Sequence, residues 1–298
     1  VEKYTNNLET QVKIRTHEIE ASLVEIRAYK EQQVIDYFLV SLLVNPLFHN
    51  RNDSRNIRTE FYVRQKRSFV FRGKEVEIGG DLCMAERLRL GGRSYVMVLN
   101  GDAMGKSLQG AVGALVMGIV VNSIIAYTRE RSEDLHPEEW QRRAYNALSH
   151  IYQAFEGSMY MTAVMGLLDE QTGVFHHWSA EHPYIVLYRR GEAFGLPIED
   201  EIPKLGWSND RPIQIISHEM EPGDVLFMGS DGREDFLTAA SGSKFRNEDE
   251  RVFERLVDEA RGDLRRLITI MGSMGDVGDD LSFLRVEYLG PAEATPPE

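Results

Sequence analysis

The chain has 298 residues with 34 Lys and Arg against 47 Asp and Glu, so its formal charge is −13. This length fits one large domain or two ordinary ones, and a hydrophobic fraction of 42% excludes general disorder. The acidic excess argues against nucleic-acid binding, which needs clustered basic side chains, but it is compatible with a divalent-metal enzyme. A single cysteine, Cys83, excludes an intramolecular disulfide framework and a Cys-rich zinc site, and it favours a cytoplasmic location.

Residues 1–45 contain no glycine, and their apolar residues follow a seven-residue rhythm. The a positions hold Val12, Ile19 and Ile26, the d positions hold Val1, Leu8 and Tyr29, and Thr5, Arg15, Ser22 and Gln33 interrupt the seam. This pattern predicts a two-stranded coiled coil that forms a homodimer, ending near Leu43 or Val44 before Pro46. One amphipathic helix packed on its own domain is the alternative.

This helix is similar to the linkers that join sensor to output domains in bacterial signalling proteins. Because the chain starts at Val1 without a signal peptide, we expect a fragment of a longer protein with an upstream sensor or membrane domain. Rotation of the coil is then expected to shift helices 106–130 and 137–156, and with them the Asp102 loop.

From Phe61 onward the period changes to that of strands interleaved with helices. Strands are predicted at 61–72, 95–99, 161–168, 184–188, 213–216, 225–228 and 281–286, helices at 106–130, 137–156 and 249–272, and tight turns at 91–92 and 169–173. The pattern favours an α+β layered domain over residues 46–290. The tail 291–298 is predicted to be disordered.

Residues 107–128 carry no charge, and their length alone would allow a membrane span of roughly 20 residues. The polar Gln109, Asn122 and Ser123 and three interspersed glycines argue against a span. We therefore expect a helix buried on all sides, and no membrane segment in this chain.

Four acidic motifs lie next to glycines at the ends of predicted strands. They are EIGGD ending at Asp81, NGDAMGKS around Asp102, GSDG around Asp231, and GDD ending at Asp279 and Asp280. Each alone is most simply a surface turn. Together they can gather carboxylates at one site, where mutual repulsion raises their pKa unless a cation compensates. Oxygen-only ligands suit Mg²⁺ or Mn²⁺, and two such ions about 3.5–4 Å apart can activate water for attack on phosphorus.

The motif series resembles the metal-dependent protein serine/threonine phosphatases of the protein phosphatase 2C type, and among them the bacterial SpoIIE branch. The matching stretches are EIGGDLC, VLNGDAMGKSLQGAVGAL, MYMTAVMGLLDEQTG, WSAEHPYIVLYR, PGDVLFMGSDG and GDDLSFL, which run in family order from Glu77 to Leu284. The resemblance implies a four-layer α-β-β-α sandwich with two divalent ions, Mn²⁺ or Mg²⁺, at one end. It also implies a phosphoserine or phosphothreonine substrate on a bacterial protein, such as a STAS-type anti-sigma-factor antagonist.

By match to the family motifs, Asp102 bridges the two ions and, with Asp231, forms the catalytic pair. Asp231 and Asp279 complete one ion's shell, and the Ala103 carbonyl serves the other ion, with Asp81 nearby. Glu181 replaces the family's usual glycine. No equivalent of the eukaryotic phosphate-binding arginine is evident, Lys106 is a weak substitute, and the substrate-binding residues and the role of Asp280 stay open. His182 is interpreted as a turn residue before Pro183.

Two other functions stay open at this point. NGDAMGKS misses the nucleotide-binding P-loop pattern by one residue, with Asn100 in place of the first glycine, and Asp102 would put a negative charge into a phosphate cradle. The other alternative is a catalytically silent phosphatase-like module that only binds a partner. The complete set of four acidic motifs argues against that loss of activity.

Overall fold

The computed structural model describes residues 2–131, 135–197, 202–208, 212–240, 243–245, 249 and 251–291. The predicted disordered tail, apart from Pro291, lies outside these residues. The helices are α1 (Glu2–Val44), α2 (Leu108–Arg131), α3 (Pro137–Gln153), α4 (Val252–Ala260) and α5 (Leu264–Met274), with short 3₁₀ turns η1 (Asn45–Leu47) and η2 (Asp231–Arg233). The strands are β1 (Asn50–Arg51), β2 (Ile57–Arg64), β3 (Arg67–Phe71), β4 (Lys74–Ile78), β5 (Asp81–Leu90), β6 (Arg93–Ala103), β7 (Met161–Asp169), β8 (Val174–Ala180), β9 (Val186–Arg189), β10 (Glu192–Gly195), β11 (Ile216–Glu219), β12 (Val225–Gly229), β13 (Phe236–Ala240), β14 (Ser243–Phe245), β15 (Asp276–Val277) and β16 (Leu281–Tyr288).

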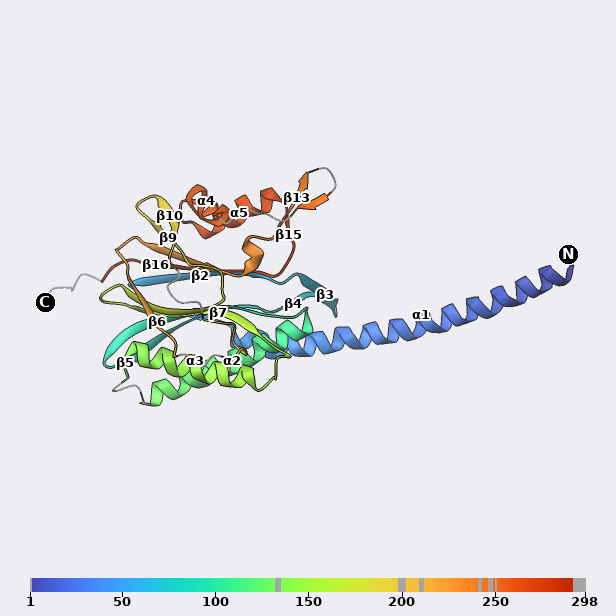
Figure 1. The fold of residues 1–298 in the computed structure, drawn as a ribbon, viewed down its shortest axis with the longest axis horizontal. Coiled ribbons are helices and arrows are strands. Elements are labelled where there is room, and N and C mark those ends of the chain that lie inside the picture. Colours follow the sequence, from blue (N-terminus) through green and yellow to red (C-terminus); the bar gives the residue numbers. More distant parts are fainter. Residues whose placement is uncertain are drawn as a thin grey trace.

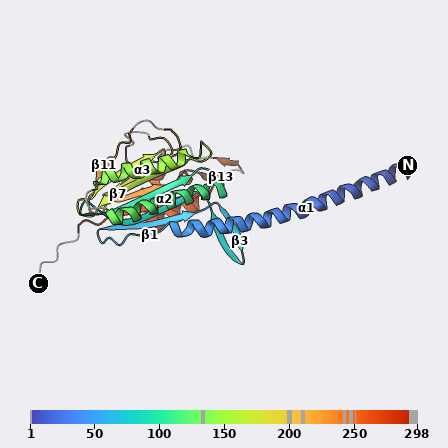
Figure 2. The same cartoon turned by 90° about the horizontal axis from the view of Figure 1, so that it is seen from below.

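Two sheets lie face to face between two layers of helices, which confirms the four-layer α-β-β-α sandwich (Figure 1). Sheet A has the strand order β1-β5-β6-β7-β8-β11, and sheet B has the order β10-β9-β12-β16-β2. The outer face of sheet A packs on α2 and α3, and the outer face of sheet B packs on α4 and α5. Viewed from the sheet A side, α2 and α3 cover the sheet and run roughly along its strands (Figure 2).

Alternation along the strands explains this layering. In β6, Tyr95, Met97 and Leu99 belong to the core under α2 and α3, whereas Val96 and Val98 belong to the core between the sheets. A strand buried on both faces reads as a nearly continuous apolar run, because successive side chains point to opposite faces. Continued along the same alternation, Asn100 and Asp102 point into the space between the sheets at the end of β6.

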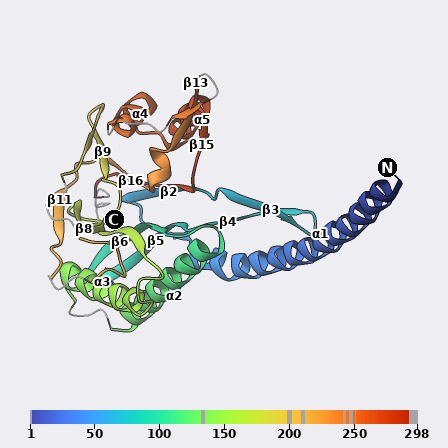
Figure 3. The same cartoon turned by 45° about the vertical axis from the view of Figure 1, so that its right-hand side comes forward.

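The helix α1 ends at Val44, as the sequence predicts. Its last turns pack on the domain, since Tyr37, Ser41 and Val44 are buried. Here α1 lies beside α2 and the β3–β4 hairpin, with Phe38 stacked on Phe71 at 4.0 Å between ring centroids (Figure 3). The rest of α1 extends away from the domain with its apolar side chains exposed.

The structure corrects several sequence predictions. The long strand predicted at 61–72 is two strands, β2 and β3, which belong to different sheets. The helix predicted at 249–272 is two helices, because Arg261 adopts a left-handed conformation (φ 54°) and Asp263 then caps α5 by accepting a hydrogen bond from the Arg266 N–H. Strands β9 and β11 also begin two or three residues later than predicted.

Within the described residues, one helix, Leu108–Glu130, is long and apolar enough to cross a membrane. Its Ala114, Met117 and Val121 pack into the core on sheet A. The expectation of a helix buried on all sides is wrong, however, because Ile119 and Tyr127 on its outer side are half exposed.

Candidate active site

The predicted site residues lie at one end of the sandwich, where the two sheets' inner faces open to solvent. Asp81 begins β5 and Asp102 lies near the end of β6, and they are direct partners in the sheet. Thr162 of β7 is the next partner of Asp102. Directly paired residues project to the same face of a sheet, so these three side chains form a row.

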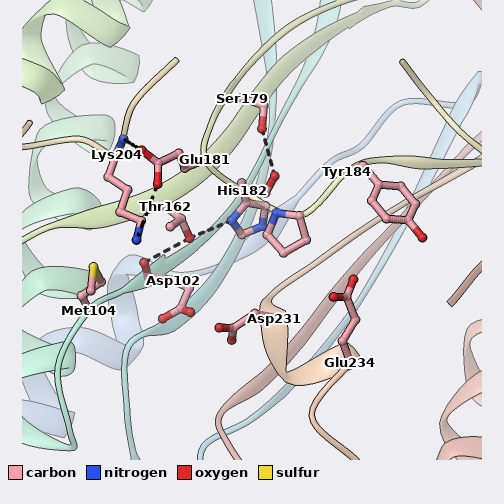
Figure 4. A pocket seen from close by; sticks show the side chains of 11 residues that line it. Asp102, Met104, Thr162, Ser179, Glu181, His182, Tyr184, Lys204, Asp231 and Glu234 are labelled. Carbon is pink, nitrogen blue, oxygen red and sulfur yellow. Dashed lines mark hydrogen bonds and ion pairs between the residues drawn. The ribbon is translucent and has the colours of Figure 1, made fainter. Parts of the chain in front are cut away.

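The other two carboxylates come from sheet B. Asp231 opens the η2 turn directly after β12, and Asp279 precedes β16. The η2 turn packs tightly against the backbone at Asp280, because a Cβ added at Gly232 would lie 2.0 Å from the Asp280 carbonyl oxygen. Figure 4 shows the carboxylates of Asp102 and Asp231 pointing toward each other across an open pocket of about 570 Å³.

Burial and neighbouring carboxylates raise the pKa of Asp102 and of Asp81. Burial, and then the charges of Asp231, Asp280 and Asp279, raise the pKa of Asp102 to about 7. Burial and the charge of Asp102 also raise the pKa of Asp81 well above its ordinary value. The protein therefore gathers carboxylates here, and burial together with the neighbouring charges disfavours the ionised forms of Asp102 and Asp81.

A polar network between the two sheets fixes this arrangement. The Ser230 hydroxyl donates to Asp81, and the Ser282 N–H donates to Ser230 Oγ at 3.0 Å. The Asn100 amide donates to Ser282 Oγ at 2.8 Å. Because Ser230 adjoins Asp231 and Ser282 follows Asp279 and Asp280 closely, these bonds position the sheet B carboxylates against those of sheet A.

His182 extends the network and was missed as a site residue by the sequence interpretation. It is buried, and its Nε2 lies 2.7 Å from the side-chain carbonyl oxygen of Asn100, which can only accept. Nε2 therefore carries the proton, and Nδ1 accepts from the Thr162 hydroxyl at 3.0 Å. Burial lowers the pKa of His182 to about 3, so the ring stays neutral. Thr162, a polar residue in the apolar run of β7, was the available signal.

Asp280 and Lys106, whose roles the sequence leaves open, have clear places. Asp280 accepts from the backbone N–H groups of Lys66 and Gly80, at 2.7 and 2.9 Å, and so holds the turn that leads to Asp81. Lys106 lines a different pocket, between α1 and α2. The P-loop alternative is disfavoured, because Asn100–Ala103 are part of β6 and do not form a phosphate-binding loop.

The donor set fits divalent cations. Asp81 Oδ1 is buried without a hydrogen-bond partner, and the oxygen-rich cluster around it suits Mg²⁺ or Mn²⁺. The Ala103 carbonyl oxygen lies against Gly80, where an added Cβ would be only 2.4 Å away. In the present side-chain conformations, no three acidic, histidine or cysteine side chains of the described residues are close enough together to hold one ion. Asp231 and Asp279 are exposed and can reorient toward a cation.

Comparison with known proteins gives a family. The family model of stage II sporulation protein E (SpoIIE) matches residues 92–289. The chain belongs to this family, and its domain is a protein serine/threonine phosphatase of the protein phosphatase 2C type. No curated protein sequence matches.

Solved structures support the fold. The phosphatase domain of SpoIIE from Bacillus subtilis, with a fragment of its regulatory domain, matches 80% of this chain and 65% of that one (TM-score 0.58, 15% identity). The structure of the RsbU and RsbW domains of Rv1364c from Mycobacterium tuberculosis matches 81% of this chain and 61% of that one (TM-score 0.58, 21% identity). The SiaA-PP2C domain of Pseudomonas aeruginosa matches 88% of this chain and 99% of that one (TM-score 0.62, 15% identity). The chain thus spans less than two thirds of the first two structures.

The raised pKa of Asp102 predicts a pH-dependent loss of stability in EDTA. Between the ordinary value of 3.8 and about 7, the folded protein holds a proton that the unfolded chain has lost. The free energy of unfolding therefore falls as the pH rises through this window. In EDTA at pH 8, we expect the free energy of unfolding of Asp102→Asn to be higher than that of the parent by on the order of 2 kcal/mol. Near pH 4, the two proteins should be equally stable.

Urea unfolding in EDTA checks this, with Asp36→Asn on the exposed side of α1 as the control that changes little at either pH. Added Mn²⁺ is expected to stabilise the parent and not Asp102→Asn. A variant less stable than the parent at pH 8 in EDTA would contradict the electrostatic account.

Proposed function

We propose that this domain hydrolyses phosphoserine and phosphothreonine on a bacterial signalling protein in a reaction that depends on two divalent ions. The observation that carries this proposal is the group of carboxylates from both sheets, held at one end of the sandwich, where the pKa values of Asp102 and Asp81 are raised. Such a group is costly unless cations compensate its charge. The SpoIIE family, whose members are metal-dependent phosphatases, supports the same chemistry.

When bound, Mn²⁺ or Mg²⁺ supplies Lewis-acid activation of water and charge stabilisation at a phosphoryl group. Asp102 lies centrally in the cluster and would contact both ions. Asp231 and Asp279 would hold one ion. The Ala103 carbonyl oxygen, together with Asp81, would hold the other ion. Ser230 and Asp280 position these ligands through their hydrogen bonds to Asp81 and Gly80. Neutral His182 keeps Thr162 and Asn100 in place and adds no charge to the site.

Hydrolysis of p-nitrophenyl phosphate tests this function. We expect turnover with Mn²⁺ that EDTA abolishes, and a loss of at least about 100-fold in Asp102→Asn and Asp231→Asn, because each removes charge that holds the ions. Asp36→Asn is the matched control. Retention of turnover in both site variants would contradict the assignment, whereas bound Mn²⁺ without turnover in the parent would favour the silent binding module.

We also propose that residues 1–45 dimerise the chain and connect the phosphatase domain, residues 46–290, to an upstream cytoplasmic or membrane-attached sensor. A STAS-type anti-sigma-factor antagonist is the proposed substrate. The support for dimerisation is the exposed seam of α1, where Val12, Ile19 and Ile26 are each at least half exposed. A lone helix gains little stability when its apolar side chains stay in water.

The contacts of α1 refine the route of regulation. Its last turns pack on α2 and on the β3–β4 hairpin, and α3 packs on α2. Ile78 at the end of β4 shares a small core with Tyr37 of α1 and Ala111 of α2. Beyond Ile78 come the glycines that lead to Asp81. Movement of α1 would therefore reach the site through the hairpin as well as through α2.

Sedimentation velocity at micromolar concentration tests the dimer. We expect a dimer that Ile19→Glu combined with Ile26→Glu converts to monomer, because both charges enter the seam. Val24→Glu is the matched control, since Val24 lies on the outer face of the heptad and is 67% exposed. A monomeric parent, or equal disruption by Val24→Glu, would count against pairing through this seam.

A further inference from the structure

One cationic side chain reaches the acidic pocket, and no sequence motif pointed to it. Lys204 lines the pocket together with Asp102, Thr162, His182 and Asp231, and it is the only lysine or arginine lining it within the described part of the chain. In Figure 4 its side chain runs from the loop past Glu181, with the ammonium on the side of Asp102 and Met104.

The backbone on both sides of Lys204 is fastened to sheet A. Before it, the Ile202 carbonyl accepts from the Glu181 N–H at 2.9 Å. After it, Leu205 and Met161 exchange two backbone hydrogen bonds, of 2.9 and 3.1 Å. Met161 is next to Thr162, so the loop is tied to the same strand end as the site. Lys204 therefore has a fixed Cα position and a long flexible side chain above the carboxylates.

Glu181 is the resting partner of this lysine. It accepts from the Lys204 N–H at 3.3 Å, and its other oxygen lies 3.6 Å from Nζ. Glu181 adopts a left-handed backbone conformation (φ 42°), which is uncommon for a residue with a side chain. A partly exposed ion pair at this distance is weak. The ammonium can therefore leave Glu181 for an anion of higher charge that enters the pocket.

We propose that Lys204 binds the phosphate of the substrate, and that Glu181 holds the lysine when the pocket is empty. The inference rests on the proposed function and deepens it. A phosphate monoester brings about two negative charges and three acceptor oxygens, and an ammonium contact to such a group is a strong, charge-assisted hydrogen bond. The other charged residues that line the pocket are carboxylates, so this contact would discriminate between a bound phosphate and a bound neutral ester.

The experiment compares Lys204→Gln, Lys204→Arg and Glu181→Gln with the parent, and uses Lys106→Gln as the control, because Lys106 lines the separate pocket beside α1. Two quantities are measured with Mn²⁺ present. One is the split between kcat and KM for p-nitrophenyl phosphate, and the other is the Kd of inorganic phosphate by calorimetry.

We expect Lys204→Gln to raise both KM and the phosphate Kd about tenfold, as the loss of one charged hydrogen bond predicts. Its kcat should stay within about threefold, because the contact exists before and during the reaction. Lys204→Arg should restore most of the affinity, and Lys106→Gln should change neither quantity. Glu181→Gln keeps an oxygen for the Lys204 N–H and should bind phosphate at least as tightly as the parent.

An unchanged phosphate Kd in Lys204→Gln would overturn the inference. An equal loss of phosphate affinity in Glu181→Gln would also overturn it, because it would mean that the ion pair only holds the loop in place. Failure of phosphate to bind the parent would overturn it as well. Turnover with an unchanged phosphate Kd in Lys204→Gln would leave the phosphatase assignment standing. If the parent shows no turnover but Lys204→Gln still weakens phosphate binding, the role of Lys204 would stand and the phosphatase assignment would fall.

Discussion

Repulsion among carboxylates at the open end of the sandwich is the constraint around which the site is organised. Asp81 and Asp102 are neighbours in one sheet, and Asp231 and Asp279 arrive from turns of the other. Burial and proximity raise the pKa of Asp102 to about 7, so the fold carries an electrostatic cost here that apolar residues would avoid. Clusters of carboxylates with raised pKa values are typical of functional sites, where bound cations offset their repulsion. The cluster therefore marks this end of the sandwich as the candidate active site.

The rest of the structure holds these charges in position. The cores on both sides of sheet A fix the strands, and the polar chain through Ser230, Ser282 and Asn100 locks one sheet end against the other. His182 completes that chain as a neutral ring, which suits a site that already carries strong charge. Lys204 adds a flexible, positively charged side chain to the same pocket. A cluster of carboxylates with a flexible lysine beside it fits the binding of metal ions by the carboxylates and of a phosphate by the lysine.

Much of the fold could be predicted from the sequence, because apolar periodicity fixes which faces are buried. The end of α1, the turns at 91–92 and 169–173 and the four-layer architecture all follow from such patterns or from the family resemblance. The break between α4 and α5 was missed, although Gly262 and the N-cap residue Asp263 mark it in the sequence. The acidic motifs indicated Asp81, Asp102, Asp231 and Asp279 because each lies at a strand end. His182 and Lys204 were missed because their roles depend on contacts between segments far apart in the chain.

The most direct test of the central claim is a crystal structure of the protein grown with Mn²⁺, with anomalous diffraction data collected to locate the ions. The account predicts two anomalous peaks about 3.5–4 Å apart. Both should contact the Asp102 carboxylate, with Asp231 and Asp279 beside one of them and the Ala103 carbonyl beside the other. Peaks elsewhere on the protein, with the carboxylates still uncompensated, would contradict the claim that this cluster exists to bind cations.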